Sequence, residues 1–272
     1  METKKYYLKD YYPNLKYNPY IEITKIDEIE GKDTSRCVIV VPGGGYDVVS
    51  KREGDPICLE FLRQGYKSVK LVYSTDAINH SINYPNQVLE LMATVDFLRK
   101  NSNSLKINKD KIVLCGFSAG GHLAGIYSYL YKDKDLQKSL GVLEHNLKPN
   151  ALVLSYPVVT LIDDTHEGTK NVITGCNKSL EKLLSIELNV SSDYPKTYLW
   201  STKEDELVPI SNTIMLDEAL KKNGVYHKTH IFEHGCHGLA LGNKLTVPFG
   251  IKENDEISIW INEALEFLDE VL

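Results

Sequence analysis

Runs of apolar residues alternate along the chain with segments in which apolar residues recur every three or four positions. The segment 36–41 (RCVIVV) has no polar alternation and stops at Pro-Gly-Gly-Gly, which is typical of a strand buried on both faces of a sheet. Other segments share this short, β-branched character. We therefore expect strands at 36–41, 67–73, 111–115, 151–154, 197–200 and 228–232.

Helices are expected between these strands. The clearest candidate is 85–100, whose apolar residues fall on one helical stripe, namely Val88, Leu91, Met92, Val95 and Leu98. Pro56 near the beginning and Gly65 after the end are typical of a helix over 55–64. The helices predicted in this way are 55–64, 85–100, 119–131, 210–222 and 256–272.

This alternation predicts the α/β class, with a doubly wound, mostly parallel sheet and helices on both of its faces. No internal repeat or Pro/Ser-rich linker divides the chain, so we expect a single domain over residues 1–272. The segment 156–195 has weak periodicity. It is either an insertion or small cap over the carboxyl edge of the sheet, where ligands of such sheets bind, or a long connection with one helix around 179–185.

Composition and charge narrow the classes of partner. The chain is 42% hydrophobic, and 31 Lys and Arg against 37 Asp and Glu give a formal net charge of −6 without a basic stripe. We therefore expect neither nucleic acid nor a membrane as a partner. The N-terminus has no apolar stretch fit for a signal peptide, and the five cysteines form no Cys-x-x-Cys pair. A cytoplasmic location is the expectation that follows.

Residues 116–120 (GFSAG) are the strongest chemical signal. The motif directly follows a predicted strand and opens a predicted helix, which is the setting of a nucleophile elbow and makes Ser118 the candidate nucleophile. The N-terminus of that helix would direct free N–H groups at developing negative charge. A phosphate-binding loop or a plain tight turn is the alternative, and the strand–turn–helix context favours the nucleophile.

A serine nucleophile needs a general base, and in this architecture the base comes after an acidic residue in the chain. The loop 233–238 follows the last predicted strand, and glycines near His237 free the backbone to turn, so we prefer His237 to His234. His122, one turn beyond Ser118, is expected to be a structural hydrogen-bonding residue beneath the elbow. The other histidines precede the acid, sit in poorly patterned segments or lie in or beside a strand: His80, His145, His166, His227 and His230.

The carboxylate that orients the base is expected in the loop after the strand at 197–200. Three acidic residues compete there, Glu204, Asp205 and Glu206. Asp205 stands before Leu-Val-Pro, and Pro209 marks the start of the next helix. We prefer Asp205, because Glu204 and Glu206 are expected to face solvent.

The loop 41–46 (VPGGGY) is the candidate for stabilising an oxyanion. Its three glycines offer backbone N–H groups without side chains in the way, and the N–H of Ala119 would join them. Dinucleotide binding is the rival, but the loop lacks G-x-G-x-x-G and no helix follows at once. A metal site is not expected, because no carboxylate cluster joins the close pair His234 and His237.

Four motifs stand in order along the chain: PGGGY, GFSAG, EDELVP and GCHG. With them the chain resembles the α/β-hydrolase fold, and within it the esterase and lipase families that have an HGGG-type oxyanion loop. It is most similar to the bacterial carbohydrate-esterase branch that includes acetylxylan and acetylated-sugar esterases. Pro42 departs from the histidine of the broader families, which bears on the subfamily. The resemblance implies a nucleophile, acid and base at Ser118, Asp205 and His237, and oxyanion donors at Gly44, Gly45 and Ala119.

The resemblance further implies hydrolysis of small-molecule esters through an acyl-enzyme, without a cofactor. We expect short acyl groups, acetyl above all, carried on a sugar or small oligosaccharide. Tyr46, next to the oxyanion glycines, is expected to wall a shallow acyl pocket and contact the substrate. The alternatives are a general carboxylesterase, a serine peptidase of the same fold and a hydrolase-fold protein that only binds ligands. The oligomeric state stays open, a homo-oligomer included.

Overall fold

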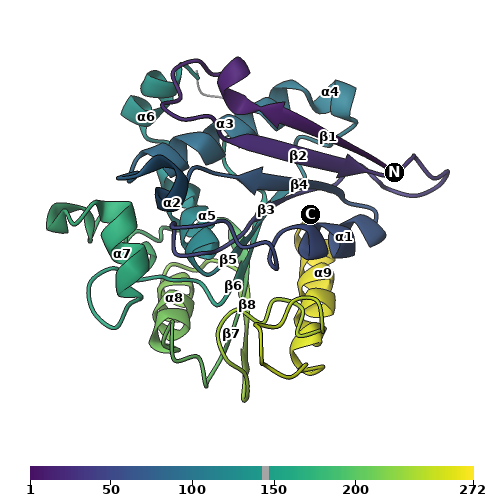
Figure 1. Cartoon of the computed structure of the whole chain (residues 1–272). Helices are drawn as coiled ribbons and strands as arrows, with labels where there is room; N and C mark the ends of the chain where they lie inside the picture. Colours follow the sequence, from purple (N-terminus) through teal and green to yellow (C-terminus); the bar gives the residue numbers. More distant parts are fainter. Residues whose placement is uncertain (143–146) are drawn as a thin grey trace.

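The computed structural model describes residues 1–142 and 147–272 and is built around one eight-stranded sheet (Figure 1). The strands lie side by side in the order β1 (Glu2–Tyr7), β2 (Tyr20–Lys25), β4 (Lys67–Val72), β3 (Cys37–Val41), β5 (Ile112–Phe117), β6 (Ala151–Ser155), β7 (Lys196–Thr202) and β8 (His227–Phe232). The pairs β1–β2 and β2–β4 are antiparallel, and all other neighbours are parallel. The predicted α/β, mostly parallel sheet is confirmed. His145 lies outside the described residues.

Helices cover both faces of this sheet (Figure 1). They are α1 (Asp55–Arg63), α2 (Asp76–Asn79), α3 (Asn86–Lys100), α4 (Ser102–Leu105), α5 (Ala119–Leu130), α6 (Lys134–Leu140), α7 (Glu167–Thr174), α8 (Ser211–Lys222) and α9 (Trp260–Val271). Helices α1 and α9 pack on one face, with Phe61 and Trp260 in its core. Helices α3, α5 and α8 pack on the other, with Leu91, Leu123 and Leu216. No helix in the described ranges is long and apolar enough to cross a membrane.

Strand β3, in the middle of the sheet, is apolar throughout because both of its faces are covered. Alternate side chains of β3 enter different cores, Val38 and Val40 on the side of α1 and α9, Ile39 and Val41 on the side of α3 and α5. Every residue of β3 is buried. This two-sided burial explains why the segment shows no polar alternation.

The edge hairpin of β1 and β2 was not predicted from the sequence. Strand β1 (ETKKYY) is exposed along nearly its whole length, so it has no apolar face to reveal a strand pattern. Strand β2 buries only Ile21 and Ile23. The hairpin forms because backbone groups of β2 pair with β4 and those of β1 pair with β2, which no side-chain pattern encodes.

Residues 156–195 connect β6 to β7 and are called the cap segment below, after the predicted insertion or cap, which stays a prediction. The helix around 179–185, which belonged to one of the two alternatives for this segment, does not form: the chain there forms a short 3₁₀ turn, η2 (Lys178–Leu180), and an α-helix of this segment is α7 instead. His166 caps the beginning of α7, and Gly175 ends it with φ of 58°. Local caps rather than periodicity therefore decide where this helix lies.

The parallel strands end at the same edge of the sheet, and the loops that follow them carry the candidate residues. The glycine loop follows β3, Ser118 follows β5, Asp205 follows β7 and His237 follows β8. Because these four strands share one sheet and one direction, residues far apart in the chain come together at its carboxyl edge.

Candidate active site

Ser118 occupies a strained turn between β5 and α5. Its φ and ψ are 51° and −120°, a conformation that L-residues rarely adopt. The flanking glycines allow the close contacts that this turn requires. A Cβ atom at Gly116 would lie 2.6 Å from the carbonyl oxygen of Gly120, and one at Gly120 would lie 2.1 Å from that of Val41. The two glycines of the GFSAG motif are therefore steric requirements of the elbow.

Ser118, His237 and Asp205 form a continuous hydrogen-bonded chain. The Oγ atom of Ser118 lies 2.8 Å from Nε2 of His237, and Nδ1 of His237 lies 2.6 Å from Oδ2 of Asp205. The other carboxylate oxygen of Asp205 accepts the backbone N–H groups of Leu207 and Val208 at 3.0 and 2.8 Å. Because a carboxylate accepts the proton of Nδ1, Nε2 is left free to accept the Ser118 hydroxyl.

The competing acid and histidine pair with each other at the surface. Oε1 of Glu204 lies 3.0 Å from Nδ1 of His234, and Oε2 of Glu204 accepts the N–H of Gly235. The hydrogen bond lowers the pKa of Glu204 and raises that of His234, and both side chains are more than half exposed. Glu206 is exposed as well. The structure thus brings the preferred pair, and not the alternative one, to Ser118.

The glycine loop after β3 folds back on itself next to the elbow. Gly44 and Gly45 both have positive φ, 118° and 65°, and a Cβ atom at Gly44 would lie 2.2 Å from the carbonyl oxygen of Val48. The carbonyl group of Gly44 accepts the N–H groups of Asp47 and Val48. Within the described chain, the N–H groups of Gly44, Gly45 and Ala119 have no acceptor. They are available to a negatively charged oxygen.

Glu53 is a buried residue of the site that the sequence analysis missed. It is 3% exposed, and its two oxygens accept the N–H of Gly43 at 2.9 Å and the hydroxyl of Tyr156 at 2.8 Å. That hydroxyl accepts the N–H of Ala240, and the Tyr156 ring packs against His237 with centroids 4.9 Å apart. Glu53 therefore links the glycine loop to the histidine loop. A glutamate in a polar stretch of the sequence carries no signal of this role.

Arg52 makes a second link to the histidine loop. Its Nη1 atom donates to the carbonyl oxygens of Gly238 and Thr246, at 2.5 and 2.6 Å. Gly238 directly follows His237. The neighbours Arg52 and Glu53 thus tie both loops to one short segment before α1.

The expectation that Tyr46 walls the acyl pocket is wrong. Tyr46 is fully buried, and its hydroxyl lies 2.8 Å from Nδ1 of His122, whose Nε2 lies 2.8 Å from the carbonyl oxygen of Leu184. Burial raises the pKa of Tyr46 and lowers that of His122 to about 4. A neutral His122 accepts from the tyrosine and donates to the carbonyl. Both residues therefore have a structural role beneath the elbow. The sequence analysis expected that role for His122 but not for Tyr46.

A cavity of about 1030 Å³ opens beside Ser118. Apolar and polar side chains share its walls, and the cap segment contributes three residues to them: His166, Gly168 and Val172. The sequence analysis did not favour His166 for a role at the site, because His166 precedes Asp205 in the chain. Across the described ranges, no group of three or more His, Cys, Asp or Glu side chains could hold a metal ion.

Comparisons with known proteins agree with this architecture. Over 211 residues the chain is 34% identical to Endo-1,4-beta-xylanase B of Butyrivibrio fibrisolvens, which covers 76% of this chain and 33% of the xylanase. The crystal structure of an acetyl ester-xyloside bifunctional hydrolase from Caldicellulosiruptor lactoaceticus matches with a TM-score of 0.80 and 31% identity, over 95% of this chain and 90% of that one. The carboxylesterase Cest-2923 from Lactobacillus plantarum WCFS1 matches with a TM-score of 0.86 and 27% identity, over 99% and 98%.

The chain spans less than half the length of the curated relatives that it matches. The family model BD-FAE matches residues 26–220, which include the glycine loop, the elbow and Asp205. With the sheet order and the elbow described above, this match shows that the chain belongs to the BD-FAE family and has the α/β-hydrolase fold.

Proposed function

We propose that the chain is a serine esterase that hydrolyses short-chain esters, acetyl esters above all, of sugars or small oligosaccharides. The observation that carries the proposal is the hydrogen-bonded chain from Ser118 through His237 to Asp205. It ends beside three N–H groups without an acceptor in the described chain, those of Gly44, Gly45 and Ala119. Acyl transfer requires a nucleophile, a general base and hydrogen-bond donors for the oxyanion at one place.

In the acylation step, Nε2 of His237 takes the proton of Ser118, and Oγ attacks the ester carbonyl carbon. The carbonyl oxygen becomes an oxyanion, which the three N–H groups bind. Asp205 accepts the Nδ1 proton throughout and stabilises the imidazolium ion that forms. The bond to the alcohol oxygen then breaks, and that oxygen leaves with the proton from Nε2.

In the deacylation step, water takes the place of the alcohol. Nε2 of His237 removes a proton from the water, whose oxygen attacks the carbonyl carbon of the acyl-enzyme. The tetrahedral intermediate collapses, the carboxylic acid departs and Ser118 recovers its proton from His237. No step needs a cofactor.

The cavity and the relatives support a sugar ester as the substrate. A volume of about 1030 Å³ is much larger than an acetyl group needs, so an alcohol of the size of one or more sugar rings has room. Charged side chains such as Lys51 and Arg52 line it together with apolar ones, which suits a polyhydroxylated alcohol. The relatives named above include an acetyl ester-xyloside hydrolase and a xylanase. Since Tyr46 does not wall the pocket, the preference for acetyl rests on these relatives.

A fluorophosphonate probe tests the serine mechanism directly. We expect it to label the wild-type chain at Ser118 and to leave Ser118→Ala unlabelled. An unlabelled wild-type chain with no activity on aryl acetates would reduce the protein to a ligand-binding member of the fold.

A substrate series tests the second half of the proposal. We expect kcat/KM to fall from p-nitrophenyl acetate to the butyrate and octanoate, and acetate to be released from peracetylated xylose or xylobiose. Preference for the octanoate, or no acetate from any sugar ester, would leave only a general carboxylesterase.

A further inference from the structure

His166 brings a side chain of the cap segment into the active-site cavity. It lines the same cavity as Ser118 and His237, and its side chain is half-buried. A Cβ atom at Gly45 would lie 3.7 Å from Cε1 of His166, so the imidazole packs beside the glycine loop. The mechanism proposed above assigns no role to this histidine.

Hydrogen bonding at the beginning of α7 defines the tautomer of His166. The backbone N–H of Thr169 donates to Nδ1 at 3.1 Å, and the Thr169 hydroxyl lies 2.8 Å from the same atom. A backbone N–H can only donate, so Nδ1 carries no proton and the proton of the neutral ring is on Nε2. Burial and the neighbouring His237 lower the pKa of His166, which favours this neutral form. Nε2 has no acceptor in the described chain.

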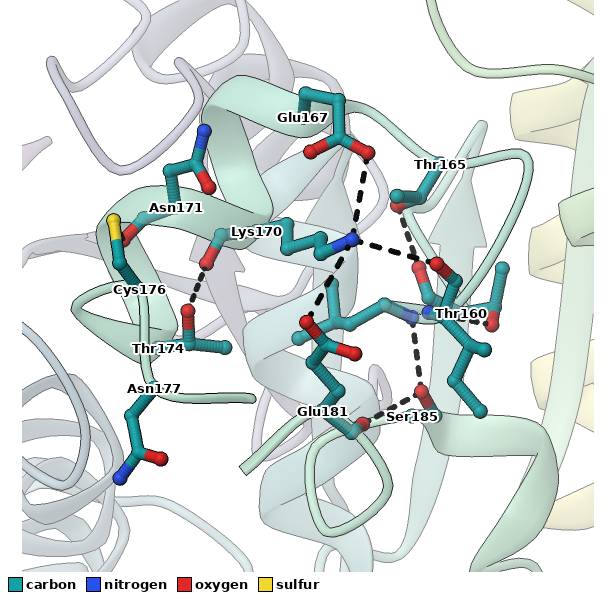
Figure 2. Close-up of polar contacts among 12 residues, drawn as sticks. Thr160, Thr165, Glu167, Lys170, Asn171, Thr174, Cys176, Asn177, Glu181 and Ser185 are labelled. Carbon is teal, nitrogen blue, oxygen red and sulfur yellow. Dashed lines mark hydrogen bonds and ion pairs between the residues drawn. The ribbon is translucent and has the colours of Figure 1, made fainter. Parts of the chain in front are cut away.

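The helix that carries His166 is anchored to the rest of the cap segment. Figure 2 shows Lys170 of α7 beside Glu181, which lies beyond the end of the helix at 3.7 Å, and beside Glu167 of the same helix at 3.4 Å. Lys170 also donates to the carbonyl oxygen of Ile162, which precedes α7, at 3.4 Å. The contacts of Lys170 with residues before and after α7 tie the helix, and with it the imidazole, to the cap segment before any substrate binds.

We propose that His166 is a substrate-positioning residue that donates its Nε2–H to an oxygen of the alcohol half of the ester, a sugar hydroxyl or ring oxygen. This inference rests on the proposed function. The carbonyl oxygen of the substrate is already bound by the N–H groups of Gly44, Gly45 and Ala119, and an acetyl methyl group accepts no hydrogen bond. In a sugar acetate, the remaining acceptors all belong to the sugar.

The variant His166→Asn separates this role from the capping of α7. Asparagine is a favoured N-cap residue, so its side-chain oxygen can still accept the N–H of Thr169, while it lacks a donor at the position of Nε2. Asn177→Ala is the matched control. It removes an N-cap from the same cap segment, where Asn177 accepts the N–H of Ser179, and Asn177 does not line the cavity.

The readout compares two substrates that share the acetyl group. A xylose monoacetate offers hydroxyl and ring oxygens beyond the reacting ester, and phenyl acetate offers none. We expect His166→Asn to lower kcat/KM for the xylose acetate about 5- to 20-fold, mainly through KM, since one hydrogen bond to substrate is lost. Activity on phenyl acetate and the rate of fluorophosphonate labelling should stay within twofold of wild type. Asn177→Ala should leave both substrates unaffected.

The alternative outcomes are distinct. Equal losses on both substrates would overturn the inference, because His166 would then act on the reacting groups or on the fold. An unchanged kcat/KM for the xylose acetate would overturn it as well, as would a wild-type chain that cleaves phenyl acetate and no sugar acetate. A wild-type chain that is neither labelled nor active on phenyl acetate would instead refute the proposed function.

Discussion

Replacing Glu53 with glutamine tests whether one buried carboxylate holds the two halves of the site together. Glu53 is 3% exposed and accepts two hydrogen bonds, from the N–H of Gly43 and the hydroxyl of Tyr156. A glutamine side chain has one oxygen and one NH₂ group in the same space, so it can accept only one of the two.

The expected loss of stability and activity follows from the hydrogen bonds that Gly43 and Tyr156 can still make in the variant. The N–H of Gly43 can only donate, so the amide oxygen should turn toward it and the NH₂ group toward Tyr156. The hydroxyl oxygen of Tyr156 already accepts the N–H of Ala240. In the glutamine variant, the hydroxyl proton of Tyr156 no longer has a carboxylate to which it can donate. One hydrogen bond to a charged group is lost and another becomes neutral, which amounts to about 2 kcal/mol of unfolding free energy. Movement of the glycine loop should lower kcat about 10- to 100-fold, less than complete removal of an oxyanion donor.

Two measurements check this expectation. Urea unfolding reports the free energy of unfolding, and kcat and KM for p-nitrophenyl acetate report the loop. Glu60→Gln is the matched control, because Glu60 lies on the neighbouring helix α1 and, within residues 1–142 and 147–272, pairs only with the exposed Arg63. It should change neither quantity. If Glu53→Gln kept kcat within twofold and its stability within about 0.5 kcal/mol of wild type, the buried network would not be what holds the glycine loop.

Three further predictions concern the serine, its partners and the buried histidine. Ser118→Ala and His237→Ala should each lower kcat for p-nitrophenyl acetate by about four to six orders of magnitude and the double variant by little more, whereas additive losses would contradict their acting as a unit. Asp205→Asn should lower kcat at least about a hundredfold, and Glu204→Gln should leave it nearly unchanged; the reverse order would move the acid to Glu204. Between about pH 6.5 and 4 the unfolded chain binds a proton at His122 that the folded chain, with its pKa lowered to about 4, does not bind. The contribution of His122 to the free energy of unfolding should therefore fall by about 3 kcal/mol as the pH falls through this range. Burial raises the pKa of Glu90 to about 7, which changes the free energy of unfolding in the opposite sense, so the difference between wild type and His122→Gln in urea titrations isolates the part due to His122.

The α/β class and the location of the elbow could be predicted from the sequence because local patterns encode them. An unbroken apolar run such as 36–41 indicates a strand covered on both faces, and β3 is buried at every residue. The roles of Gly116 and Gly120 in the elbow could be predicted for a similar reason, since no other residue fits their close backbone contacts. The exposed strand β1 has no such apolar pattern in the sequence, because it is held by backbone pairing with β2.

The choice of Asp205 and His237 over Glu204 and His234 depended on loop position, and the geometry of the site became visible only in the structure. Both pairs lie in the same two loops, yet only one reaches Ser118. Which pair does so is decided by the way β7 and β8 end at the shared sheet edge, a property of the whole sheet.

Three residues were beyond the reach of sequence patterns. Tyr46 is adjacent to the oxyanion glycines in the chain, but its side chain turns beneath them to His122, 76 positions away. Glu53 accepts a hydrogen bond from Tyr156, which lies 103 positions away in the chain. His166 lines the cavity although it belongs to the cap segment. By itself the sequence determined which segments become strands, helices and the strained turn, since those depend on neighbours within a few positions. The tertiary structure alone decided which side chains share the cavity, because packing brings together residues that no local periodicity relates.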